Sequence, residues 1–146
     1  TDMATTVGVG GISLEAKKLL RATEESLELG IREARVGNHI GDIGHAVETR
    51  LKKDDFGVIR ELVGHGVGRD LHEDPYIPNF GNIGEGEELK DGMVLALEPM
   101  ATAGSPKIMI GKDGWTYQTK DGSLAAHFEH SIVITKDGPE ILTRSQ

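Results

Sequence analysis

The sequence predicts one α+β domain, in which an antiparallel sheet lies over two helices. Apolar residues recur at three- and four-residue spacing early in the chain, and short apolar segments separated by Gly or Asp-Gly turns follow. The chain has 146 residues, of which 37% are hydrophobic, so it can bury a core of ordinary domain size. We therefore expect residues 1–146 to form a single domain.

Two helices are predicted in the first third of the chain. The first follows Ser13, a suitable N-cap, and its apolar face consists of Ala16, Leu19, Leu20, Thr23, Leu27, Ile31 and Ala34. Its other face carries the i,i+4 pairs Arg21 with Glu25 and Glu28 with Arg32, which we interpret as a solvated surface. The second helix is expected from about Ile40 to Lys53, with Gly57 closing it and with a buried face made of Ile40, Ile43, Val47 and Leu51.

Strand-forming segments begin after the second helix. We expect strands over residues 58–63, 93–100, 108–111, 115–119, 125–135 and 140–143. Asp-Gly pairs, typical of tight turns, stand at 91–92, 113–114, 121–122 and 137–138. The Gly- and Glu-rich stretch 79–88 is expected to be a surface loop.

Charge and composition exclude several classes of function. Lys and Arg number 16 against 24 Asp and Glu, and the resulting net charge of −8 disfavours direct binding to nucleic acid or to anionic membranes. No apolar run approaches the roughly 18 residues of a membrane span, so we expect a cytoplasmic protein. The sequence has 0 Cys, so any metal must be held by oxygen and imidazole nitrogen.

Two carboxylates fall in apolar strand segments. Strand alternation places Glu98 on the face of Val94 and Ala96, where a bound cation or an ion pair must offset its burial. Pro99 cannot donate to a ladder, so we expect the strand to end or kink at this carboxylate. Glu129 lies in the next long strand, and two such carboxylates would repel each other unless a cation lies between them. The neighbouring His127 and His130 are interpreted as surface or hydrogen-bonded core residues.

Histidines flanked by glycines form the third feature. The run Gly64-His65-Gly66-Val67-Gly68 lets other groups approach the ring of His65 closely. His65 and His72 are separated by an odd number of positions, so they face opposite ways in an extended segment. We infer that one is a ligand and that the other is a substrate-facing acid or hydrogen-bond donor. Together with the carboxylates, they suggest a metal-dependent hydrolase.

Taken in order, these segments resemble the methionine aminopeptidases, which have the pita-bread fold. The resemblance is carried by residues 1–8, the helix after Ser13, and segments 37–44, 64–75, 92–104, 113–115 and 128–130. Aminopeptidases specific for X-Pro bonds share the His-Gly and Glu-Pro segments, but they usually lack the Asp-Gly-Trp and Phe-Glu-His pattern. The short stretch between His72 and Glu98 leaves no room for the inserted subdomain of type II enzymes and indicates type I.

The resemblance implies a set of site residues. Asp2, His65, Glu98 and Glu129 correspond to metal ligands, and His72 and Glu98 to catalytic residues. His72 also corresponds to a substrate contact, and Leu71 and Trp115 match positions near the pocket for the methionine side chain. The residue patterns alone suggested His65, Glu98 and Glu129 but gave no reason to choose Asp2.

The resemblance also implies the reaction. A hydroxide bridging two divalent ions, which could be Co, Mn, Fe or Zn, would release the N-terminal methionine of peptides and nascent chains, including those on the ribosome. Family members carry a further metal-binding aspartate and a catalytic histidine upstream of the position of Asp2. We therefore expect a partial domain, with the C-terminal half of the pita-bread fold plus one strand of the other half, and a monomer when complete.

Two other interpretations stay open at this point. An incomplete site could leave a catalytically impaired fragment, or a module that binds a peptide or protein without chemistry. An X-Pro aminopeptidase is the second alternative, and the residues around Trp115 disfavour it.

Overall fold

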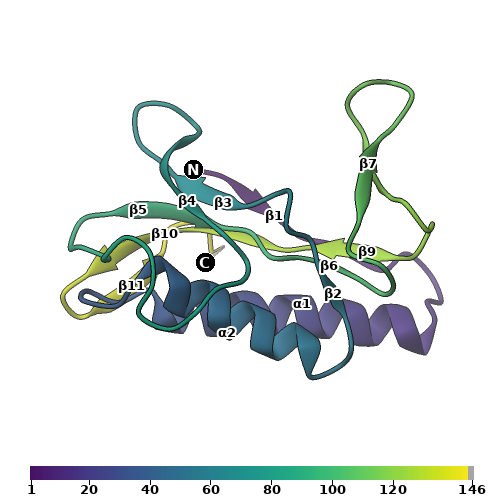
Figure 1. The fold of residues 1–146 in the computed structure, drawn as a ribbon, viewed down its shortest axis with the longest axis horizontal. Helices are drawn as coiled ribbons and strands as arrows, with labels where there is room; N and C mark the ends of the chain where they lie inside the picture. The colour runs from purple at the N-terminus through teal and green to yellow at the C-terminus, as the bar shows by residue number, and fades with distance from the viewer. Residues whose placement is uncertain (145–146) are drawn as a thin grey trace.

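A computed structural model describes residues 1–144 as a sheet covered on one face by two helices (Figure 1). The helices are α1 (Leu14–Glu33) and α2 (Ile40–Lys52). The strands are β1 (Met3–Ala4), β2 (Gly57–Val58), β3 (Gly64–Gly66), β4 (Glu73–Ile77), β5 (Val94–Leu97), β6 (Met100–Thr102), β7 (Ile108–Ile110), β8 (Tyr117–Thr119), β9 (Ala125–His127), β10 (Glu129–Thr135) and β11 (Gly138–Ile141). The predicted α+β class is confirmed.

The strands pair antiparallel throughout. The main sheet has the order β1-β10-β5-β3-β4, and β11 adds to β10. A second sheet joins β2, β6 and β9, and the hairpin β7-β8 projects away from the helices (Figure 1). Long-range pairing therefore brings the N-terminal strand β1 against β10, near the other end of the chain.

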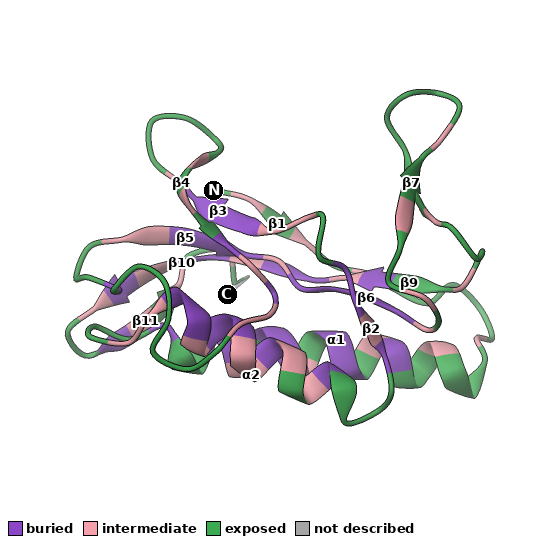
Figure 2. Ribbon diagram, viewed as in Figure 1, coloured by how far each residue is buried: buried purple, intermediate pink, exposed green. Residues whose placement is uncertain are grey.

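The core lies between the helices and the sheet. Ser13 caps α1 by accepting a hydrogen bond from the backbone N–H of Ala16 at 3.1 Å, as predicted. Buried faces of both helices turn toward the sheet (Figure 2), where α1 and α2 contribute Leu19, Ala22, Leu27, Ile31, Ile40, Ile43, Val47 and Leu51. From the sheet, Leu95, Leu97, Ile132 and Ile134 complete this layer. No helix in residues 1–144 is both long and apolar enough to cross a membrane.

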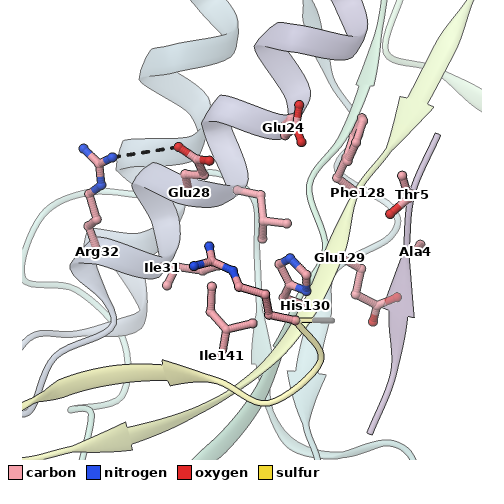
Figure 3. Close-up of a pocket in the computed structure, with 12 residues that line it drawn as sticks. Ala4, Thr5, Glu24, Glu28, Ile31, Arg32, Phe128, Glu129, His130 and Ile141 are labelled. Atoms are coloured by element: carbon pink, nitrogen blue, oxygen red, sulfur yellow. Dashed lines mark ion pairs between the residues drawn. The ribbon is translucent and has the colours of Figure 1, made fainter. Parts of the chain in front are cut away.

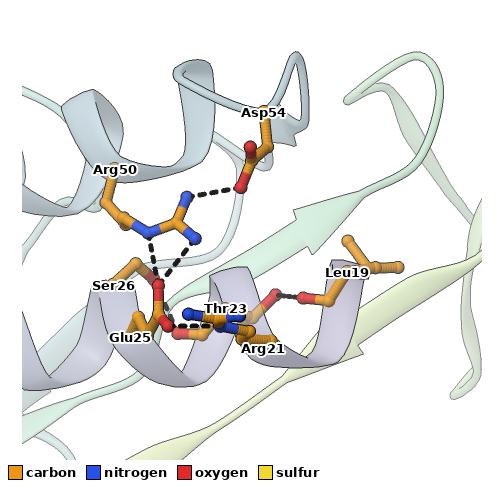
Figure 4. Close-up of polar contacts among 7 residues, drawn as sticks. All are labelled: Leu19, Arg21, Thr23, Glu25, Ser26, Arg50 and Asp54. Carbon is orange, nitrogen blue, oxygen red and sulfur yellow. Dashed lines mark hydrogen bonds and ion pairs between the residues drawn. The ribbon is translucent and has the colours of Figure 1, made fainter. Parts of the chain in front are cut away.

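An ionic network joins the two helices (Figure 4). Arg50 of α2 contacts Glu25 of α1 through Nε at 2.8 Å and Nη2 at 2.7 Å, and it reaches Asp54 through Nη1 at 2.7 Å. Arg21 contacts the other oxygen of Glu25 at 2.6 Å, and these hydrogen bonds lower the pKa of Glu25 below its ordinary value. The pair Arg21 and Glu25 is therefore more than a solvated surface pair, because Glu25 also contacts Arg50 of the other helix.

Several predicted boundaries were wrong. Of the predicted strand 58–63, only Val58 is in a strand, as part of β2, and the next strand, β3, lies in the glycine run. Gly57 does not close α2: Asp55, with φ of 59°, has the left-handed conformation that follows the helix. Strand β4 was missed because Pro75 and its exposed positions hide the pattern. The last strand begins at Gly138 rather than Glu140, because Gly138 pairs with Thr135 after the turn.

Candidate metal centre

His65 lies in the middle of β3, between β4 and β5, and is only 3% exposed. A Cβ at Gly64 would collide with the backbone oxygen of Ala96, and one at Gly66 would collide with that of Asp74. The glycines therefore allow a close approach, as predicted, but the groups that approach are the backbones of the neighbouring strands and not side chains around the His65 ring. Ring atom Nδ1 lies 2.9 Å from the carbonyl of Gly66, which can only accept, so Nδ1 carries the hydrogen. Nε2 is left with its lone pair available to a cation.

Glu98 stands in the gap between β5 and β6, as its position before Pro99 predicted. Asn79 fixes its backbone by donating from Nδ2 to the Glu98 carbonyl at 3.1 Å. The side chain is 14% exposed, and its two oxygens face two imidazoles. Oε1 lies 3.6 Å from Nε2 of His65, and Oε2 lies 3.4 Å from Nε2 of His127. The sequence allowed either an ion pair or a bound cation as the partner of Glu98. The two imidazoles beside its oxygens are consistent with both.

Glu129 is the first residue of β10, between β1 and β5, and is 4% exposed. Burial, followed by the charges of Glu98 and Asp2, raises the pKa of this carboxyl to about 7. A carboxylate in this position is costly to ionise without a nearby positive charge. The site therefore has the electrostatic character of a cation site.

The structure brings the four predicted ligands into two overlapping groups. Ligand atoms of His65, Glu98 and Glu129 lie within 4.8 Å of one another, and the same holds for Asp2, His65 and His72. Imidazole nitrogen and carboxylate oxygen are suitable donors for Mn, Fe, Co and Zn. The residues present thus fit divalent cations.

Asp2 is held by a residue far along the chain. Its backbone N–H donates to Oγ of Ser131 at 2.7 Å, and this hydroxyl donates to the Asp2 carbonyl at 2.8 Å. The ring of His72 lies 4.3 Å from that of His65, at an angle of 57°. His72 therefore lies next to His65, although it belongs to the exposed β3–β4 loop.

A cavity of about 550 Å³ opens beside these groups. His65, His72, Glu98 and His127 contribute its polar side, and its apolar lining includes Ile59, Leu62, Val63, Met100 and Ile108. The hairpin β7-β8 borders it through Tyr117, Gln118 and Thr119. A largely apolar cavity beside such a cluster of donor groups has room for an apolar side chain.

Two predicted pocket residues are not brought into this cavity. Leu71 is 50% exposed and Trp115 87% exposed, and neither is among the residues that line it. Their segments, the β3–β4 loop and the tip of the β7-β8 hairpin, project from the same side of the sheet (Figure 1). Their contact with substrate stays a prediction.

The two histidines beside Glu129 differ from each other. His130 is satisfied, since Nδ1 lies 2.8 Å from Oγ1 of Thr143; burial and then the Arg144 charge lower its pKa. His127 is not satisfied: within residues 1–144, its Nε2 is the one buried side-chain nitrogen or oxygen without a hydrogen-bond partner. The interpretation as a hydrogen-bonded residue therefore fits His130 but not the buried nitrogen of His127.

A second cavity, of about 410 Å³, lies between α1 and the strands β1, β10 and β11 (Figure 3). Figure 3 shows the ion pair Glu28 to Arg32, at 3.8 Å, on its helical side. Glu129 and His130 line it from β10. Glu28 and Arg32 pair with each other across this side, and Glu129 belongs to the centre already described.

Comparison with known proteins agrees with this geometry. The profile of "Metallopeptidase family M24" matches residues 1–136. Methionine aminopeptidase 1 of Bacillus subtilis is 53% identical over 98% of the chain, and the methionine aminopeptidase of Clostridium perfringens is 50% identical over 98%. The chain spans only 58% and 57% of the length of these two relatives.

Solved structures show the same fold. The methionine aminopeptidase of Thermotoga maritima superposes with a TM-score of 0.96 at 48% identity, covering 98% of this chain and 57% of that one. A prolidase of Pyrococcus horikoshii, at 21% identity and a TM-score of 0.75, shares the fold alone; 99% of this chain and 36% of that one are covered. The predicted pita-bread fold is confirmed, and the chain belongs to metallopeptidase family M24.

Proposed function

We propose that the protein removes the N-terminal methionine of polypeptides by metal-dependent hydrolysis, as a methionine aminopeptidase. One observation carries the proposal: His65, Glu98 and Glu129 converge within 4.8 Å beside a largely apolar cavity of about 550 Å³. Relatives named methionine aminopeptidase, one of them 53% identical to this chain, support it. Because the chain spans just over half of those relatives, the activity of the whole protein is part of the proposal.

Two divalent ions are proposed at the centre. Asp2, Glu98 and Glu129 supply three carboxylates, and the two ligand groups overlap at His65. When bound, such ions would polarise a substrate carbonyl and lower the pKa of a bound water, so that hydroxide is available at neutral pH. The raised pKa of Glu129 supports this, since it marks a carboxylate that needs neighbouring positive charge to ionise.

The remaining steps belong to side chains of the chain itself. Glu98, only partly exposed between two imidazoles, would hold the proton of the attacking water at a carboxylate oxygen. His72, at the cavity wall, would hydrogen-bond the scissile amide and steady its developing charge. The apolar lining around Leu62 and Met100 suits the flexible thioether of methionine.

The proposal is tested by peptide cleavage with the full natural protein. We expect release of methionine from Met-Ala-Ser in the presence of Co²⁺ or Mn²⁺. Release of lysine from Lys-Ala-Ser should be slow, because an apolar cavity disfavours a charged side chain. Glu98→Gln should abolish turnover. Glu140→Gln, the same change at an exposed position of β11, should not.

Two results would replace the proposal with its alternatives. Binding of Met-Ala-Ser without cleavage, at full metal loading, would indicate a peptide-binding module. Faster cleavage of Ala-Pro-Ser than of Met-Ala-Ser would indicate an X-Pro aminopeptidase. Ribosome-borne substrates and a monomeric complete protein stay predictions from the resemblance, and a cytoplasmic location stays a prediction from the sequence.

A further inference from the structure

His127 is held in place on both sides of its backbone. It is the last residue of β9 and pairs in register with Met100 of β6. Its N–H donates to Oγ1 of Thr6 at 2.9 Å, and the same hydroxyl donates to the His127 carbonyl at 2.7 Å. The ring therefore projects from a backbone fixed by a strand pair and by the N-terminal segment, which is how a site residue is preorganised.

The buried ring nitrogen of His127 lies next to a carboxylate. Nε2 of His127 is buried and lies 3.4 Å from Oε2 of Glu98, without hydrogen-bond geometry. On the opposite side of the same carboxylate, Oε1 lies 3.6 Å from Nε2 of His65. A buried polar atom without a partner is unfavourable, and the carboxylate beside it is the acceptor that could satisfy it.

We infer that His127 is a positioning residue for Glu98: its Nε2–H supports Oε2 and so keeps Oε1 on the side of His65 and Glu129. This inference rests on the metal centre of the proposed function. Ligating carboxylates are commonly oriented by such outer hydrogen bonds, whose loss weakens metal binding.

Two other roles fit the geometry less well. His127 belongs to neither group whose ligand atoms lie within 4.8 Å of one another, so it is not placed as a ligand. His127 lines the cavity and its side chain is 36% exposed, but Nε2 itself is buried, so the exposed part of the ring, and not this nitrogen, is what a substrate can reach. Orienting the Glu98 carboxylate is the role that gives the buried Nε2 of His127 a hydrogen-bond partner.

The test compares two polar replacements of different length in the full natural protein. His127→Gln keeps an N–H donor at about the reach of Nε2, whereas His127→Asn is too short to present one there. His45→Asn, on α2, is the control for loss of an imidazole away from the centre. Co²⁺ affinity is measured by calorimetric titration, and the urea midpoint of each metal-free variant is recorded beside it.

We expect His127→Asn to weaken Co²⁺ binding about 10- to 100-fold, while His127→Gln and His45→Asn bind within roughly threefold of the parent. The metal-free urea midpoints should agree among all four proteins. The inference would be overturned if His127→Asn and His127→Gln bound Co²⁺ with the same affinity, whether that affinity equalled the parent's or was lower. It would also be overturned if His127→Gln bound Co²⁺ more weakly than His127→Asn. A parent that binds no Co²⁺ would overturn the proposed metal centre and this inference together. A parent that binds Co²⁺ but whose His127 variants do not differ as expected would overturn this inference alone.

Discussion

Glu98 and Glu129 present carboxylate oxygens within 4.8 Å of each other, one just after β5 and the other at the start of the neighbouring strand β10. The strand break at Pro99 and the pairing of β10 with β5 place them there. Two carboxylates at this distance, one buried and one partly exposed, repel each other in the absence of a cation. The centre is therefore built at a cost in stability that cations can offset.

The raised pKa of Glu129 predicts how metal-free stability depends on pH. Its folded pKa is about 7, against an ordinary value of 4.5, so between these values the folded protein holds a proton that the unfolded chain has lost. The free energy of unfolding should therefore decrease as pH rises through this window, by up to about 3 kcal/mol. Urea unfolding at several pH values, with chelator present, measures it.

Glu129→Gln is the control for that titration, because it removes the ionisable group and should flatten this part of the curve. Adding Co²⁺ should stabilise the parent more at the upper end of the window than at the lower end, since metal competes with the proton. Identical pH curves for the parent and the variant would contradict the prediction.

Close strand approach at Gly64 predicts a large effect of one methyl group. In Gly64→Ala the new Cβ meets the backbone oxygen of Ala96, so β3 must move away from β5. We expect a loss of about 3 kcal/mol in the free energy of unfolding and weaker metal binding, because His65 moves with the strand. Gly11→Ala, which has no atom within 4 Å, should leave both unchanged. Equal stability of the two variants would be inconsistent with this strand packing.

The interhelical network predicts different effects for two arginines. Arg50 is 14% exposed and contacts both Glu25 and Asp54, so Arg50→Ala should cost about 2 kcal/mol in chemical denaturation. Arg32→Ala removes a 3.8 Å pair with 68% of the arginine exposed, and its effect should stay within about 0.5 kcal/mol. A larger loss at Arg32 than at Arg50 would refute the assignment.

The single tryptophan gives a direct test of the predicted substrate contact. Trp115 is 87% exposed, so its fluorescence should be that of a solvated indole. If it covers the methionine side chain, methionine at saturating concentration should shift the emission to shorter wavelength, while lysine should not. An unchanged spectrum during inhibition by methionine would remove Trp115 from the pocket.

The sequence was sufficient for the features that depend on local pattern. Both helices follow from the spacing of Leu19, Leu27 and Ile31 in one and of Ile43 and Val47 in the other, and both are confirmed. Glu98 is predicted as a site residue because a carboxylate in an apolar strand needs a partner; the strand break expected at Pro99 is confirmed, since β5 ends at Leu97 and β6 begins at Met100.

Features that depend on distant contacts could not be predicted in this way. Asp2 joins the centre through Ser131, 129 positions away, so only the family resemblance indicated it. The role inferred for His127 depends on which oxygen of Glu98 faces which ring, a property of the folded sheet rather than of residue order. The pairing of β3 with β4 was hidden by glycines and Pro75, which are poor strand formers.

Bound metal per chain is the most direct measurement of the central claim. After dialysis of the full natural protein against Co²⁺ or Mn²⁺ and removal of free ions, elemental analysis should find one to two ions per chain in the parent and in Glu140→Gln. Glu98→Gln should retain far less, since it loses a charged ligand shared with His65 and Glu129. A parent without bound metal, or a Glu98→Gln variant that retains as much as the parent, would contradict the account.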